Sequence, residues 1–133
     1  MANDWDVPYR QSLHEALALL SGQWTVAVLA TLALGERRYK DLMAEVNGVE
    51  ERVGWVSHPK PVTDKVLTDT LQRARDNGLV VRRAEGSQIG GSVWYRLTPS
   101  GKELLRALRP LATWAQQNHD NLAKDTATTT DET

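Results

Sequence analysis

Apolar residues recur with a helical period in several stretches of the chain. In the stretch at residues 62–78, Leu67, Leu71 and Ala74 fall on one side of a helix, while charged and amide side chains fall on the other. The stretch at residues 23–34 is apolar almost all round, as in a helix that is buried on several sides. The pattern predicts helices at residues 10–20, 23–34, 39–46, 63–77 and from Pro99 onwards.

Capping residues delimit two of these helices. Thr63 suits the N-cap because its hydroxyl can accept from backbone N–H groups of the first turn, and Asp64 adds negative charge where the helix dipole favours it. Gly78 suits the left-handed position that follows a helix end. Thr98 and Pro99 suit the N-cap and the first position of the last helix.

Two strands are predicted after the fourth helix. Residues 79–84 and 92–97 are rich in β-branched and aromatic side chains, and a turn at residues 85–91 joins them into a hairpin. A charged turn is predicted at residues 36–38. The expected fold class is therefore mainly α with a small antiparallel β-hairpin (α+β).

The remaining segments are predicted as loops or ends. Asn47-Gly48 is a strong turn signal and opens a loop that runs to Lys60. A chain of 133 residues with 41% hydrophobic and 25% charged residues is typical of one globular domain. We expect an N-terminal arm at residues 1–9, the domain at 10–122 and a polar, disordered tail at 123–133.

The charge is unevenly distributed along the chain. The formal net charge is −1, yet residues 36–106 carry 13 Lys and Arg against 10 Asp and Glu, while the remainder carries 3 against 7. The middle of the chain is therefore basic and the ends are acidic. This small excess permits DNA binding without requiring it.

Several other classes of function are disfavoured. The absence of cysteine excludes disulfides and thiolate metal sites. The N-terminal residues lack the pattern of a signal peptide, and no stretch approaches the ~18 apolar residues of a membrane helix. His14, His58 and His119 lie far apart and form no metal motif, and no catalytic constellation is present. We expect a cytoplasmic protein that is not an enzyme and has no cofactor, metal or membrane contact.

Three motifs occur in order along the chain: ALALLSGQWTVAVLATLALGERRYKDLMAEV, TDKVLTDTLQRARDNGLVVRR, and VWYRLTPSGKELLRAL followed by Trp114. Together, over roughly residues 13–114, they resemble the winged helix-turn-helix transcription regulators of the HxlR type, within the MarR-like group. The chain departs from the family in two places. Gln11 stands where many members have a cysteine, and Gly48 to Lys60 looks like an insertion before the recognition helix.

The resemblance implies double-stranded DNA as the partner. In the family's pattern the N-terminal half of the recognition helix enters the major groove, whose base edges carry a readable donor and acceptor code. Lys65 can donate to guanine, Gln72 can pair with adenine and Asp69 can accept from cytosine. These three side chains are equally typical of a helix face that is exposed to solvent and binds nothing. The implied DNA-binding residues are Arg37, Arg38, Lys40, Lys60, Thr63, Asp64, Lys65, Thr68, Asp69, Gln72, Arg73, Arg82, Arg83 and Gln88.

The basic residues outside the recognition helix have structural interpretations too. In the hairpin, which would be the wing, Arg82, Arg83 and Gln88 would reach phosphates or the minor groove, but arginines on an edge strand also discourage aggregation. The Arg38-Tyr39 pair sits on the family's Arg-aromatic position, which favours a partly structural role.

The first and last helices carry apolar stripes larger than one small core needs, which predicts a homodimer. Such a dimer presents two recognition helices about one DNA turn (~34 Å) apart. We expect association with the nucleoid when DNA is bound.

Two alternatives use the same fold. Trp24, Trp94 and Trp114 lie in apolar patterns typical of core or dimer packing, whereas Trp55 lies in the loop and could cover the core, contact DNA or close a pocket. A sensor would bind an aromatic metabolite near the dimer interface, with Trp24, Trp55 and Trp114 lining the site. A protein-interaction module that has lost DNA binding would fit the near-neutral charge and the acidic residues of the recognition helix.

Overall fold

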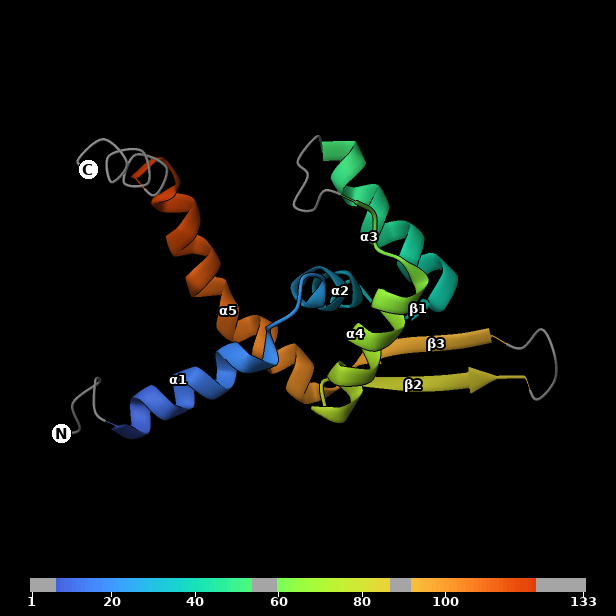
Figure 1. The fold of residues 1–133 in the computed structure, drawn as a ribbon, viewed down its shortest axis with the longest axis horizontal. Helices are drawn as coiled ribbons and strands as arrows, with labels where there is room; N and C mark the ends of the chain where they lie inside the picture. The colour runs from blue at the N-terminus through green and yellow to red at the C-terminus, as the bar shows by residue number, and fades with distance from the viewer. Residues whose placement is uncertain (1–6, 54–59, 87–91, 122–133) are drawn as a thin grey trace. The chain divides into compact units, whose positions relative to one another are not determined.

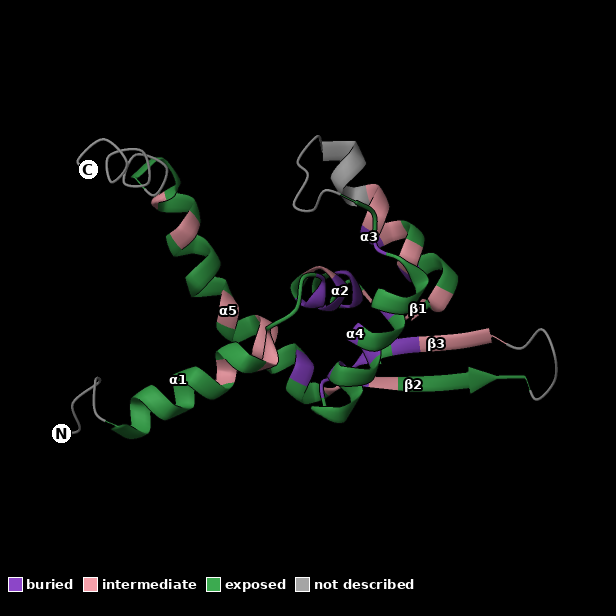
Figure 2. Cartoon of the chain, in the orientation of Figure 1, coloured by how far each residue is buried: buried purple, intermediate pink, exposed green. Residues whose placement is uncertain are grey.

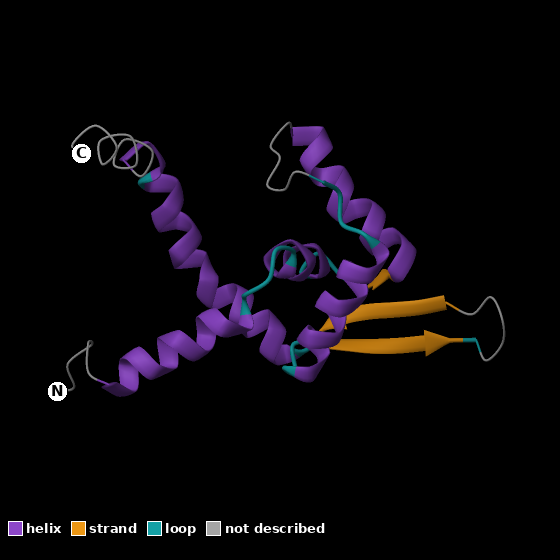
Figure 3. Ribbon diagram, in the orientation of Figure 1, coloured by secondary structure: helices purple, strands orange, loops and turns teal. Residues whose placement is uncertain are grey.

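The computed structural model describes residues 7–53, 60–86 and 92–121, and it divides into two units, residues 1–102 and 103–133. The described residues form five helices and three strands, whose arrangement Figure 1 and Figure 3 show. The elements are α1 (Val7–Leu19), α2 (Thr25–Leu32), β1 (Arg37–Arg38), α3 (Tyr39–Val53), α4 (Asp64–Asp76), β2 (Val80–Glu85), β3 (Ser92–Leu97) and α5 (Pro99–Gln117). The predicted fold class, mainly α with a small antiparallel sheet, is confirmed. No described helix is both long and apolar enough to span a bilayer.

The core lies where α2 packs against α3, α4 and β3. Figure 2 shows buried residues concentrated on these elements, whereas none of the residues of α1 is buried and Gly101 alone is buried in α5. Leu29, Leu42 and Leu67 are completely buried. Each such leucine contributes about 1.5–3 kcal/mol relative to an exposed position. The helices α2, α3 and α4 and the sheet thus share one hydrophobic core.

The ends of α4 agree with the predicted caps. The hydroxyl of Thr63 accepts from the backbone N–H of Val66 at 3.3 Å. At the other end Gly78 has a φ of +75°, and the N–H of Leu79 donates to the carbonyl of Ala74 at 2.9 Å. This is the Schellman arrangement, in which buried Leu79 leads directly into β2.

The sheet has one strand more than predicted. Its strand order is β1-β3-β2, and both pairings are antiparallel. Arg37 and Arg38, predicted as part of a charged turn, pair with Tyr95 and Trp94 of β3. The prediction of a turn was wrong because a strand of two residues has no periodicity of its own and depends on its partner.

The predicted end of the third helix was also wrong. The helix continues through Asn47 and Gly48 to Val53, so the turn and the start of the predicted loop are helical. Gly48 does not adopt a positive φ, and the side-chain oxygen of Asn47 accepts from the backbone N–H of Val62 at 2.8 Å. This long-range hydrogen bond uses Asn47 in a way that a local turn signal does not foresee.

The other helix boundaries differ less. α1 begins at Val7, within the predicted arm, because Pro8 is tolerated in a first turn, where its missing N–H has no intrahelical partner. α2 is two residues shorter at each end than predicted, and its Val26 is exposed rather than buried. α5 runs on through Pro110.

Thr98 and Gly101 join the start of α5 to the end of α4. The Thr98 hydroxyl accepts from the N–H of Gly101 at 3.0 Å and donates to the carbonyl of Gly78 at 2.6 Å. A Cβ on Gly101 would lie 2.3 Å from the carbonyl oxygen of Leu79. The backbone of the two segments is therefore too close for any side chain.

We predict that Gly101→Ala lowers the free energy of unfolding by about 1–3 kcal/mol, because backbone must move to admit the methyl group. Chemical denaturation monitored by circular dichroism measures the change. Gly48→Ala is the matched control, since no atom lies within 4 Å of its added Cβ. That substitution should stabilise the protein by about 0.5–1 kcal/mol in a helix. Destabilisation by Gly48→Ala would contradict the helical assignment of this residue.

Candidate nucleic-acid interface

The outer face of α4 carries a chain of polar contacts. Lys65 Nζ lies 3.4 Å from Asp69 Oδ2, and Gln72 Nε2 donates to Asp76 Oδ1 at 2.9 Å. Arg75 donates in turn to Gln72 Oε1 at 3.2 Å. All five side chains are exposed, because Leu67, Leu71 and Ala74 take the opposite face into the core. The structure thus directs Lys65, Asp69 and Gln72 outward, as the sequence predicted.

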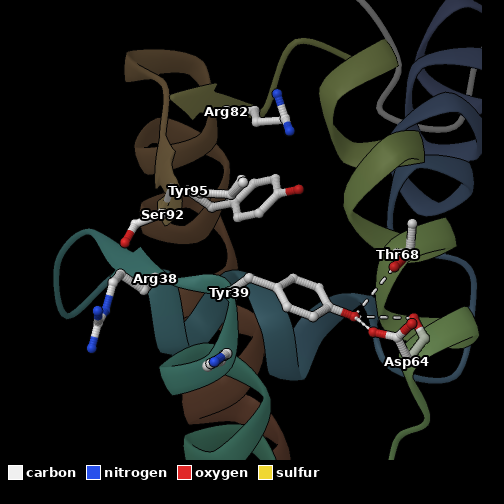
Figure 4. A pocket seen from close by; sticks show the side chains of 9 residues that line it. Arg38, Tyr39, Asp64, Thr68, Arg82, Ser92 and Tyr95 are labelled. Carbon is white, nitrogen blue, oxygen red and sulfur yellow. Dashed lines mark hydrogen bonds between the residues drawn. The ribbon is translucent and has the colours of Figure 1, made fainter. Parts of the chain in front are cut away.

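The hydroxyl of Tyr39 meets the N-terminal half of α4. It donates to Asp64 Oδ1, lies 3.2 Å from Thr68 Oγ1 and also contacts the Asp64 carbonyl (Figure 4). Its ring centroid is 6.4 Å from that of Tyr95. Burial raises the pKa of Tyr39, and the hydrogen bond to Asp64 raises it further. The sequence did not single out this hydroxyl as a functional group, and its position in the Arg-aromatic motif was the available signal.

A groove of about 580 Å³ lies between α4 and the sheet. Figure 4 shows Arg82 and Tyr95 on one side of it and Asp64 and Thr68 on the other. Its lining residues are Arg38, Tyr39, Lys40, Asp64, Thr68, Arg82, Ser92, Val93 and Tyr95. Among the described residues, neither Lys40 nor Arg82 makes an ion pair. The groove therefore holds two cations that are available to an anionic partner.

On the other face of the sheet, arginine side chains contact a tryptophan ring and pair with carboxylates. Trp94 is aligned with Arg38 and Arg83 on its neighbouring strands, whose guanidinium carbons lie 5.8 and 5.3 Å from its ring centroid. Arg83 pairs with Glu36 and Glu85, each at 2.9 Å. Trp94 is only partly buried, so the structure does not place it in the core, and its packing in a dimer stays a prediction. The paired guanidinium groups shield its ring instead.

Three more predicted cations are also engaged. Arg37 lies 2.8 Å from Glu45, and Arg38 lies 3.3 Å from Asp41. Arg73 donates to the Ser21 carbonyl at 3.4 Å. The structure therefore places Arg73 against the α1–α2 turn rather than beside the groove.

The other predicted residues lie apart from the groove or outside the described residues. Thr63 caps α4, and Lys60 is exposed ahead of it. Gln88 and Trp55 fall outside the described residues. Trp24 is buried in the core of the first unit, and Trp114 is 50% exposed in the second. A pocket formed by the three tryptophans stays a prediction. Within the described residues, no group of His, Asp and Glu could hold a metal ion.

Comparisons with known proteins agree on the class of protein. The model of the HxlR-like helix-turn-helix family matches residues 56–123. YtfH of Escherichia coli (strain K12), described as an HTH-type transcriptional regulator, is 29% identical over 104 residues, which are 78% of this chain and 71% of that protein. An HTH-type transcriptional regulator of Methanothermobacter thermautotrophicus is 28% identical over 84% of this chain and 74% of its own length.

A solved structure extends this similarity to the fold. A transcriptional regulator of the MarR family from Enterococcus faecalis V583 superimposes with a TM-score of 0.69 and 27% identity. The superposition covers 92% of this chain and 99% of the other. The arrangement of helices and sheet is therefore that of a winged helix-turn-helix regulator.

The pKa of Glu36 gives a test of the ion pairs in the sheet. Arg83 donates to this carboxylate and holds its pKa below the ordinary value of 4.5. The ion pair therefore stabilises the folded protein fully at a pH above the ordinary pKa of Glu36. This contribution is lost as the pH falls through the lowered pKa. We predict that Arg83→Gln raises the pKa of Glu36, measured by carbon-detected NMR titration of the carboxyl group. Arg75→Gln serves as the control and should leave it unchanged. An ordinary pKa for Glu36 in the unaltered protein would contradict the pairing.

Proposed function

The chain belongs to the HxlR-like helix-turn-helix family and is a DNA-binding transcriptional regulator of that type, and we propose that it acts as a homodimer whose α4 reads a specific DNA sequence. The N-terminal half of α4 enters the major groove, and the β2–β3 wing follows the backbone or the adjacent minor groove. A regulator of this kind works in the cytoplasm, on the nucleoid when bound.

The observation that carries this proposal is the outward polar face of α4 beside a groove with unpaired cations. Lys65 and Asp69 are held in an exposed ion pair, which contributes only about 0–1 kcal/mol to stability. The ion pair can therefore break at a small cost in free energy when both side chains bind the edges of DNA bases. Lys65 then donates to guanine, and Asp69 accepts from cytosine N4.

The unpaired cations supply the phosphate contacts. Lys40 and Arg82 line the groove, and Lys60 is exposed ahead of α4. Within the described part of the chain these three have no carboxylate partner to release before they meet a phosphate, whereas Arg83 would have to leave Glu36 and Glu85. We therefore assign the contacts with the DNA backbone to Lys40, Arg82 and Lys60 before Arg83. Such contacts set affinity and its salt dependence more than sequence preference.

The dimer is supported by apolar side chains left exposed on α1 and α5. On α1, Leu13 is 44% exposed and Leu17 is 53% exposed. On α5, Leu111 is 53% exposed and Trp114 is 50% exposed. Each helix thus carries an apolar stripe that its own unit does not cover, and a second copy of the chain would bury it.

We predict that Lys40→Ala and Arg82→Ala each weaken DNA binding and reduce the slope of log K against log salt by about one, because each removes one phosphate contact. The DNA is a duplex that the protein itself selects from a random pool, and affinity is measured by fluorescence anisotropy at several salt concentrations. Arg75→Ala is the control, since this arginine on the C-terminal half of α4 binds Gln72. Binding that is insensitive to salt and to both substitutions would refute this interface.

Sedimentation velocity at micromolar concentration tests the dimer. We predict twice the chain mass for the unaltered protein and the single-chain mass for Leu17→Asp combined with Leu111→Asp, because the charges would stand in the apolar interface. Leu34→Asp, at a 73% exposed leucine outside α1 and α5, should remain dimeric. A single-chain mass for the unaltered protein would remove the dimer from the proposal.

A further inference from the structure

Two polar contacts from α3 reach the start of α4. Every residue from 63 to 66 is exposed, so this turn has few apolar contacts of its own. Asn47 accepts from the N–H of buried Val62 just before the turn. The hydroxyl of Tyr39 contacts Asp64 in the first turn and Thr68 one turn further on (Figure 4). The second of these contacts reaches side chains of the reading face itself.

Tyr39 is in turn held by the sheet. It begins α3 directly after β1, and its ring lies at 53° to that of Tyr95, a residue of β3 that is only 7% exposed. A tyrosine hydroxyl is protonated at neutral pH, and burial and Asp64 raise the pKa of Tyr39 further, so the hydroxyl can donate to Asp64. The packing of the ring against the sheet sets where this hydroxyl lies.

We infer that Tyr39 is a specificity-determining residue that acts by positioning: its hydroxyl orients Asp64 and Thr68 for contact with DNA bases. This inference rests on the proposed function of α4. Asp64 Oδ1 is occupied by Tyr39, which leaves Oδ2 as the acceptor for an exocyclic amine such as cytosine N4. Thr68 lies one helical turn further on, and its Oγ1 contacts the same hydroxyl.

Orientation matters because a free carboxylate accepts from many directions. An Asp64 side chain that is free to rotate can turn to water or to a neighbouring base, so a mismatched base pair costs little. An Asp64 held in one rotamer accepts at one place only, and a mismatch leaves its oxygen without a donor. The hydroxyl of Tyr39 thus increases discrimination without touching DNA.

The hydroxyl is separable from the ring. Tyr39 meets the sheet through its ring, whose centroid lies 6.4 Å from that of Tyr95, and it meets α4 through its hydroxyl. The substitution Tyr39→Phe removes the hydroxyl alone and leaves the aromatic volume in place. It is therefore expected to fold, which circular dichroism and thermal unfolding verify.

The test measures binding of Tyr39→Phe to the selected duplex, to each single base-pair variant of it and to a scrambled duplex. We expect discrimination to fall about 5- to 10-fold at the base pairs that Asp64 and Thr68 face. This loss is a part of the discrimination that one good base contact provides. Affinity for scrambled DNA should change less than about 2-fold, because phosphate contacts dominate it.

Two controls separate positioning from folding. Thr31→Val removes a buried hydroxyl of α2 that bonds to the Ala27 carbonyl, away from the groove, and it should leave discrimination unchanged. In a protein that already carries Asp64→Ala and Thr68→Val, Tyr39→Phe should have no further effect on discrimination, because both side-chain partners of the hydroxyl are gone. A further loss in that background would show that Tyr39 acts by another route and would overturn the inference.

Other outcomes are equally decisive. Full discrimination by Tyr39→Phe, or an equal loss of affinity for selected and scrambled DNA, would overturn the positioning role while leaving the proposed function intact. If the unaltered protein shows no preference among duplexes, the proposed function fails and the inference fails with it.

Discussion

The burial of one face of α4 is the constraint on which the interface depends. Leu67 and Leu71 are almost completely buried against the core, at about 1.5–3 kcal/mol each, and Ala74 completes the stripe. A helix of 3.6 residues per turn must then present its remaining positions to solvent. The Schellman stop at Gly78 leads the chain straight into β2, so the same packing positions both the reading face and the wing.

The distribution of ion pairs decides where the protein can meet an anion. The net charge of −1 gives no general attraction to DNA, but the cations are not equivalent. Arg37, Arg38 and Arg83 are paired with carboxylates, whereas Lys40 and Arg82, at the groove beside α4, have no carboxylate partner among the residues that the structure describes. Exposed pairs add little stability, but among the described arginines of the sheet they leave Arg82 without a carboxylate partner.

The sequence correctly predicted the features that depend on residues close together in the chain. The ends of α4 follow from Thr63 and Gly78, and its buried face follows from the spacing of Leu67, Leu71 and Ala74. Contacts between distant residues could not be predicted in this way. β1 exists only because β3 pairs with it, and α3 continues through Asn47 because that side chain bonds to Val62, 15 residues away. The contacts of Tyr39 with Asp64 and of Arg83 with Glu36 span 25 and 47 residues. For this reason the exposed polar face of α4 was predicted, while the groove and the ion pairs beside it were not.

The central claim is that DNA docks on the N-terminal half of α4 and the adjoining groove. Titration of ¹⁵N-labelled protein with the selected duplex, followed by amide NMR spectra, tests it most directly. The largest shifts are expected at residues 38–40, 63–69 and 82, with small changes at residues 75–77 at the far end of α4. Shifts confined to other surfaces, with residues 63–69 unchanged, would contradict the assignment of α4 as the DNA-reading helix.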